Sequence, residues 1–319
     1  MNNNLYNKNV LVLGGSGFVG SNLINKLSEI TSNITATYNS NQPTIINDDV
    51  DWVNIDLTKP NTYKNLMKDK DYVFISAAYT KGASVIVNSP MDLVTQNLVM
   101  NSYILENCYK FKVGKVIFIS SSVVYPDIDT IIDETFSTIG DPPEIYYPVG
   151  WMKRYTEILC KTYSNKIKNG FSSLIIRPSN LYGPYDNFHP EESHVIPSLI
   201  RRVVNKEMPF KIWGNGEDNR DFIFIDDFII GVLDATNLEN KFLELNLTTS
   251  VNNSINEVLE YLFEIEDFYP EIKYDITKPQ TIQKRYLSNK KAKDLIDFNV
   301  NNDIKAGLEK TIKWYRENE

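Results

Sequence analysis

The chain has 319 residues, 42% of them hydrophobic and 23% charged, a composition typical of a globular protein with a sizeable core. Its net charge of −8, without a basic tract, argues against nucleic acid or an anionic membrane as a partner. The polar N-terminus, the lack of a bilayer-length apolar run, and two cysteines and two histidines that are not at ligand spacing predict a cytoplasmic protein without a metal site.

The first predicted element is the apolar run Val10–Leu13, which is typical of a strand buried on both faces of a parallel sheet. A turn with glycines three residues apart follows, and its sequence is Gly14-Gly15-Ser16-Gly17-Phe18-Val19-Gly20. We expect Gly14 to permit the tight exit from the strand, Gly17 to let the backbone approach a pyrophosphate, and Gly20 to let the next helix pack closely. Because an apolar helical stripe follows over residues 23–30, the context predicts a dinucleotide site.

Strands and helices alternate after this turn. The pattern predicts strands at 34–38, 53–55, 72–75, 116–119 and 173–176, and helices at 91–110 and 148–163. Six parallel strands with crossover helices make an α/β fold, a doubly wound parallel (Rossmann) sheet over residues 1–180 that binds ligands at the carboxyl ends of its strands. Shorter elements follow at 195–204, 211–213, 222–225, 226–235 and 243–247. They predict a smaller C-terminal substrate-binding lobe over 181–319, with some segments returning to the first domain.

Three segments at predicted strand ends bear on the cofactor. The second strand ends in Tyr38-Asn39-Ser40, which carries neither the acid usual for NAD nor the arginine that favours NADP, so the pattern favours NAD only slightly. The acid of Asp56-Leu57 is placed to reach an adenine amino group, but a helix cap explains it equally well. The small residues of Ser76-Ala77-Ala78 suit close passage of a cofactor, and packing alone would also explain them.

These segments, Ser120-Ser121-Ser122, Lys153 and the later Arg220-Asp221-Phe222 together resemble the extended short-chain dehydrogenases/reductases, the nucleotide-sugar epimerase/dehydratase superfamily. The run Asn180–Pro184, then 186–190 and 193–197, is similar to the GDP-fucose synthase branch. The resemblance implies a nicotinamide cofactor on the large domain and a nucleotide-diphosphate sugar, GDP-linked as in that branch, against the lobe. It also implies a homodimer formed through two long helices of each subunit.

The resemblance implies roles for single residues. Ser121 is expected to contact the reacting sugar hydroxyl, Lys153 to hold the nicotinamide ribose, and His194 to act as acid or base, although His194 also fits a structural helix cap. The expected cofactor contacts are Gly14, Ser16, Gly17, Phe18, Val19, Gly20, Asp56, Leu57, Ala77 and Lys153. The expected substrate contacts are Ser122, Asn180, His194, Arg202, Trp213, Arg220 and Arg285, where the arginines suit a diphosphate but also fit solvated surface charge.

The chain departs from the family pattern at two positions. The family's catalytic tyrosine precedes the lysine by four residues, and this chain has Val149 there, which can neither donate nor accept a proton. Tyr146 and Tyr147 lie before Pro148, at the wrong spacing for the same helical face. Val123 replaces the cysteine of fucose synthases, and Ser122-Val123 replaces the Asp-Glu pair of dehydratases. Elimination and two-base epimerisation each lose a required group.

The surviving residues favour hydride transfer at one carbon. The leading hypothesis is an NAD(P)-dependent oxidoreductase acting at C4 of a GDP-linked mannose- or heptose-type sugar, for surface (capsule) polysaccharides. Atypical GDP-heptose 4-dehydrogenases, which also lack the tyrosine, resemble it. One alternative is a GDP-4-keto-6-deoxy-sugar 3,5-epimerase/4-reductase or a nucleotide-sugar 4-epimerase that uses Tyr147 or another group. The other is a non-catalytic sugar-nucleotide binder, against which the retention of Ser121, Lys153 and His194 argues.

Overall fold

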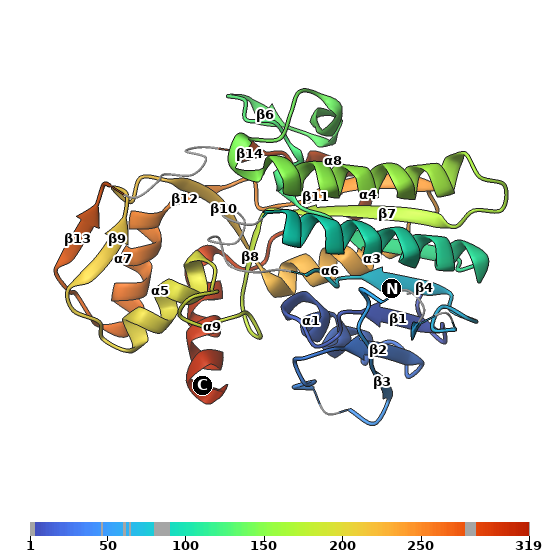
Figure 1. Cartoon of the computed structure of the whole chain (residues 1–319). Coiled ribbons are helices and arrows are strands. Elements are labelled where there is room, and N and C mark those ends of the chain that lie inside the picture. The colour runs from blue at the N-terminus through green and yellow to red at the C-terminus, as the bar shows by residue number, and fades with distance from the viewer. Residues whose placement is uncertain are drawn as a thin grey trace.

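A computed structural model describes residues 4–45, 47–59, 62–63, 65–79, 90–277 and 285–318. Its centre is a parallel seven-stranded sheet in the order β11-β7-β5-β4-β1-β2-β3 (Figure 1). The strands are β1 (Val10–Leu13), β2 (Ile34–Tyr38), β3 (Val50–Asn54), β4 (Tyr72–Ile75), β5 (Lys115–Ile119), β7 (Ser172–Pro178) and β11 (Phe242–Leu247). The expected α/β fold with a doubly wound sheet is confirmed.

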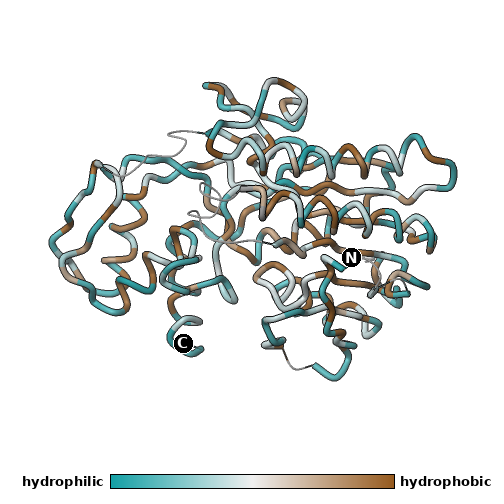
Figure 2. Tube along the Cα trace, in the orientation of Figure 1, coloured by the Kyte–Doolittle hydropathy of each residue, from teal (hydrophilic) through white to brown (hydrophobic). Residues whose placement is uncertain are grey.

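Alternation along the strands builds a core on each face of the sheet. Val10 and Val12 of β1 lie in one buried cluster, with α1 (Phe18–Leu27) and α6 (Ile225–Thr236). Leu11 and Leu13 lie in the other, with α3 (Pro90–Lys110) and α4 (Tyr147–Asn165). Successive side chains of a strand point to opposite faces, so an uninterrupted apolar strand belongs between two layers of helices. Figure 2 shows hydrophobic residues concentrated along these central strands.

The prediction of six strands, with 243–247 in the smaller lobe, is wrong. Strand β11 pairs in parallel with β7, where Leu243 lies opposite Leu174 and Leu245 opposite Ile176. Leu243, Leu245 and Leu247 are buried in the first core, so this strand completes the sheet edge beyond β7. The third strand also begins and ends earlier than expected, at Val50–Asn54. The domain boundary at residue 180 stays a prediction.

The remaining elements gather mainly at one end of the sheet (Figure 1). One three-stranded sheet contains β8 (Asn180–Tyr182), β10 (Asn219–Phe224) and β12 (Asn252–Ser254), and β9 (Phe210–Trp213) pairs with β13 (Ile272–Asp275). Helices α5 (Val195–Val204), α7 (Ile255–Glu266) and α9 (Ile304–Asn318) pack around them. The other short elements are β6 (Ile131–Ile132), which pairs with β14 (Tyr286–Leu287), α8 (Lys290–Ile296), and the 3-10 turns η2 (Ser122–Val124), η3 (Glu134–Thr138) and η4 (Glu144–Tyr146).

Cys108 and Cys160 are free thiols whose side chains are fully buried. In the part of the chain that the structure describes, no helix has both the length and the apolar character needed to cross a bilayer.

Candidate functional site

The turn after β1 is shaped by two glycines that no other residue could replace without strain. Gly14 has a φ of +83°, in the left-handed region that favours glycine, and a Cβ there would lie 2.6 Å from the Cα of Ala77. A Cβ on Gly20 would lie 2.0 Å from the carbonyl oxygen of Gly14. The first contact brings Ala77, after β4, against the turn, and the second brings α1 against the strand end.

Gly17 is different, because the protein itself does not require a glycine there. Its φ is −83°, and a Cβ would meet only the Gly14 oxygen at an ordinary 3.4 Å. Gly17 is also the N-cap of α1 and has no side chain to satisfy the first amides of the helix, which begins at Phe18 and Val19. An exposed, uncapped helix start beside a glycine that leaves room for a ligand fits a pyrophosphate. Ser16 lies half-buried in the same turn.

The predicted adenosine contacts are engaged within the protein. The Asp56 carboxylate accepts hydrogen bonds from the amide and hydroxyl of Thr58, at 3.0 and 2.6 Å, and pairs with Lys59 at 3.3 Å. The Thr58 hydroxyl is the main cause that lowers the pKa of Asp56. Leu57 is buried in the second core. Both residues therefore have structural roles, and their contact with a cofactor stays a prediction.

Lys153 is held at the carboxyl end of β5. Its Nζ donates to the carbonyl oxygen of Ile119 at 3.0 Å and lies 4.8 Å from the centre of the Phe118 ring. Burial lowers the pKa of Lys153 to about 8, and the charge of Glu157 opposes that shift. Ser121 begins the next turn, where its Oγ accepts from the amide of Val123 at 3.3 Å. Ser121 and Lys153 thus lie at the same edge of the sheet, where ligands of this fold bind.

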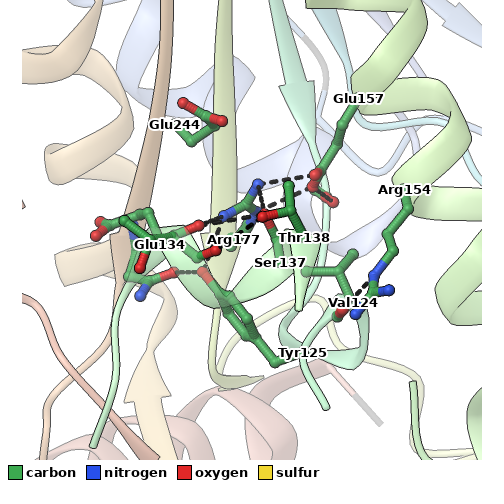
Figure 3. A network of polar contacts seen from close by, with 12 residues as sticks. Val124, Tyr125, Glu134, Ser137, Thr138, Arg154, Glu157, Arg177 and Glu244 are labelled. Carbon is green, nitrogen blue, oxygen red and sulfur yellow. Dashed lines mark hydrogen bonds and ion pairs between the residues drawn. The ribbon is translucent and has the colours of Figure 1, made fainter. Parts of the chain in front are cut away.

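A buried polar network fixes this edge, and sequence reasoning did not find it (Figure 3). Arg177, only 1% exposed, makes a bidentate ion pair with Glu157 of α4, at 3.0 and 2.8 Å. It also donates to the Tyr125 hydroxyl at 3.0 Å, and the hydroxyl of Ser120 donates to Glu157 at 2.5 Å. The one available signal was the placement of Glu157 one helical turn after Lys153.

A pocket beside η2 brings together several of the predicted substrate residues. Its walls are formed by Ser122, Val123, Tyr146, Asn180, Asn219, Arg220, Asp221, Arg285 and Leu287. Arg285 donates through Nη1 to the Ser122 carbonyl at 2.9 Å, while its Nε is buried and has no hydrogen-bond partner among the described residues. Burial lowers the pKa of Arg285 to about 10, so the side chain stays cationic at neutral pH. Two guanidinium groups at one pocket suit an anionic ligand.

Asp221 and Asn180 of the pocket are positioned by the three-stranded sheet. Asp221, 3% exposed, accepts hydrogen bonds from the Ser179 hydroxyl at 2.7 Å and from the Ser250 amide at 2.8 Å. Asn180 donates to the Asp221 carbonyl at 2.9 Å. Asp221 is therefore engaged within the protein, and Arg220 makes an ion pair with Asp218 at 3.3 Å. Sequence reasoning named Asn180, Arg220 and Arg285, but it did not place Tyr146 there.

Three other predicted residues lie outside this lining. Arg202 makes a bidentate pair with Glu207, at 3.0 Å for both bonds, and donates to the Lys211 carbonyl at 2.7 Å. Trp213 is exposed on β9. His194 is the N-cap of α5 and is open to solvent on one side, while the protein around it lowers its pKa by desolvation. Their roles toward substrate stay predictions.

The region of the missing tyrosine is also defined. Val149 lies half-buried in the first turn of α4. Tyr147 begins this helix on its outer face, 41% exposed, and its ring packs edge-on against Trp151. Tyr147 is not among the residues that line the pocket.

Comparisons with known proteins agree with the fold. Residues 10–242 match the sequence profile of the NAD dependent epimerase/dehydratase family. GDP-L-fucose synthase 1 of Arabidopsis thaliana is 26% identical, over 97% of this chain and 93% of its own. The UDP-N-acetylglucosamine 4-epimerase of Methanobrevibacter ruminantium, solved with UDP-N-acetylmuramic acid, superposes with a TM-score of 0.88 at 25% identity, covering 98% and 100% of the two chains. The Bacillus cereus UDP-glucuronic acid 4-epimerase, solved with its nucleotide sugar and NAD, shares the fold (TM-score 0.84, 23% identity, 97% and 99% covered).

Proposed function

This chain belongs to the NAD dependent epimerase/dehydratase family, and from that premise we propose that it is an NAD-dependent oxidoreductase acting at C4 of a GDP-linked mannose- or heptose-type sugar. The nucleotide is inferred from the GDP-L-fucose synthase relatives. We further propose that it works in the cytoplasm as a homodimer and serves surface-polysaccharide synthesis. The observation that carries the proposal is the pocket with Arg220 and Arg285 next to Ser122, at the strand-end edge where Lys153 lies.

The cofactor would lie on the turn Gly14–Gly20, its pyrophosphate against the amides of α1 and the exposed Gly17, with Ala77 closing the turn from β4. When bound, a nicotinamide exchanges a hydride with the sugar carbon. Lys153 is cationic below about pH 8 and would hold a ribose hydroxyl while stabilising negative charge on a neighbouring oxygen. The end of β2 carries neither the acid usual for NAD nor the arginine that favours NADP.

The substrate diphosphate would lie between Arg220 and Arg285, and Asn180 and Ser122 would contact the sugar. Arg285 is the better placed of the two arginines, since its buried Nε has no partner in the described structure and a phosphate oxygen would satisfy it. Ser121 is proposed to contact the reacting sugar hydroxyl, and His194 to act as an acid or base toward the sugar. Arg202 contributes only if a ligand displaces Glu207.

The fucose synthase and epimerase names of the relatives favour a second candidate, a 4-epimerase or a 3,5-epimerase/4-reductase. The two candidates predict different products from purified protein supplied with NAD and GDP-mannose-type sugars. Reduced nicotinamide together with a keto sugar supports the dehydrogenase, and a sugar inverted at one centre supports the epimerase. Sugar binding measured by calorimetry without either product would contradict both and indicate a binding protein.

A further inference from the structure

The chain lacks the family phenol at position 149, yet one tyrosine does face the substrate pocket. Tyr146 is the last residue of η4, where its amide donates to the Pro143 carbonyl at 2.8 Å, and it lines the pocket together with Ser122 and Val123. We propose that Tyr146 is the catalytic residue that takes the proton of the reacting sugar hydroxyl in place of the missing tyrosine. This inference rests on the proposed function.

The local packing explains why Tyr146 reaches a pocket that Tyr147 does not. A Cβ on Gly150 would lie 2.7 Å from the Val123 carbonyl oxygen and 2.5 Å from Pro142, so the glycine lets the start of α4 press directly on η2. The residue just before the helix is thereby set beside Ser122. Tyr147, one residue later, turns to the outer face against Trp151.

Two positive groups lie beside this phenol. Arg285 lies close enough that a phenolate at Tyr146 attracts its positive charge, and the guanidinium is fixed by its bond to the Ser122 carbonyl. The N-terminus of α4, which begins at the next residue, adds the positive end of a helix dipole. The phenol oxygen makes no hydrogen bond to another residue within the described ranges, and Tyr146 is half-buried, so it is open to both ligand and water.

The step balances as an oxidation. The O–H bond of the sugar hydroxyl breaks and its proton forms an O–H bond on the Tyr146 phenolate, while the carbon–oxygen bond becomes a carbonyl. The C–H electron pair leaves with its hydrogen as a hydride to the oxidised nicotinamide named above. The phenol then returns its proton to solvent.

The chain supplies a matched pair of variants for the first test. We expect Tyr146→Phe to lower kcat for reduced-nicotinamide formation by about 10²–10⁴-fold with little change in KM, the usual loss when a general base is removed. Tyr147→Phe removes the same atom one residue away and should leave kcat near that of the wild type. A Tyr146→Phe enzyme that turns over like the wild type overturns this proposal but leaves the proposed function intact.

The second test needs no turnover. Calorimetry without cofactor should show that Tyr146→Phe binds GDP-mannose about fivefold more weakly than the wild type, the worth of one ordinary hydrogen bond. Affinity for GDP alone should not change, because the phenol is placed to contact the sugar. Equal GDP-mannose affinities in the wild type and Tyr146→Phe would overturn the placement. A wild type that binds sugar nucleotides but never reduces or inverts them would overturn the proposed function itself.

Discussion

At the scale of single residues, Lys153 combines a position at the proposed site with an unusual pKa. Its ammonium is fixed between the Ile119 carbonyl and the Phe118 ring, where burial lowers the pKa from 10.5 to about 8. The folded enzyme therefore loses this charge as the pH rises through 8, well below the pH at which an exposed lysine does so. If the role of Lys153 depends on its positive charge, the pH profile of activity should show the loss of that charge.

We expect kcat/KM to fall as the pH rises through about 8, and Lys153→Met to lose most activity at every pH. Lys153→Arg is the control, because a guanidinium keeps its charge throughout this range. The profile of Lys153→Arg, measured by initial rates at constant ionic strength, should lack the fall near pH 8. A fall of the same midpoint in both enzymes would assign it to another group.

Two glycines of the first turn give a second contrast at this scale. Gly17→Ala should preserve the free energy of unfolding, because its Cβ has room, yet weaken NAD binding about tenfold by occupying the ligand side of the turn. Gly20→Ala places a Cβ 2.0 Å from the Gly14 oxygen and should destabilise the fold by about 1–3 kcal/mol. Urea unfolding and calorimetry separate the two effects. Undiminished NAD affinity in Gly17→Ala would contradict the placement of the pyrophosphate.

At the scale of elements, one buried ion pair joins helix α4 to the sheet. The Glu157 carboxylate of α4 accepts hydrogen bonds from Arg177 of β7 and from the hydroxyl of Ser120 at the end of β5. Arg177 also donates a hydrogen bond to the Tyr125 hydroxyl (Figure 3). Because Lys153 is one turn earlier on α4, this pair sets where the ammonium lies. The network is a structural support of the site, not part of its chemistry.

Arg177→Met should lower the free energy of unfolding by about 3–5 kcal/mol, since it leaves the Glu157 carboxylate buried without its counter-charge. Glu157→Gln alone should also destabilise, while the double variant should lose less than the sum of the two. Denaturant unfolding of the four proteins in this cycle measures the coupling. Strictly additive losses would show that the two side chains do not depend on each other.

The sequence predicted elements wherever the pattern was local. The apolar run of β1, the glycine turn and the long helix of α3 all depend on neighbours in the chain, and all were confirmed. It failed where the partner is distant. The sequence of 243–247 does not predict that Leu245 lies opposite Ile176. The residues around Tyr125 do not predict its hydrogen bond with Arg177. The pocket was predicted only in part. The family resemblance pointed to Arg220 and Arg285, whereas Tyr146 reaches the pocket through tertiary packing that the sequence does not show.

At the scale of the whole molecule, α3 and α4 lie side by side on one face of the sheet (Figure 1). Each carries large apolar side chains on its outer surface. On α4 these are Trp151, Tyr155 and Ile158, which share one stripe of the helix, and on α3 they are Val99 and Tyr103, one turn apart. Such a patch is costly to leave in water and marks an interface. This is the surface that the expected homodimer would bury.

The dimer is testable by charging that stripe. Tyr155→Glu combined with Ile158→Glu should convert a dimer into a monomer, because the symmetric contact would place each pair of carboxylates in an apolar interface at a desolvation cost. Tyr269→Glu alters a more exposed tyrosine outside α3 and α4 and should leave the mass unchanged. Sedimentation equilibrium at micromolar concentration gives the masses. A monomeric wild type would contradict the dimer. A dimer that persists in the double variant would show that the subunits associate through another surface.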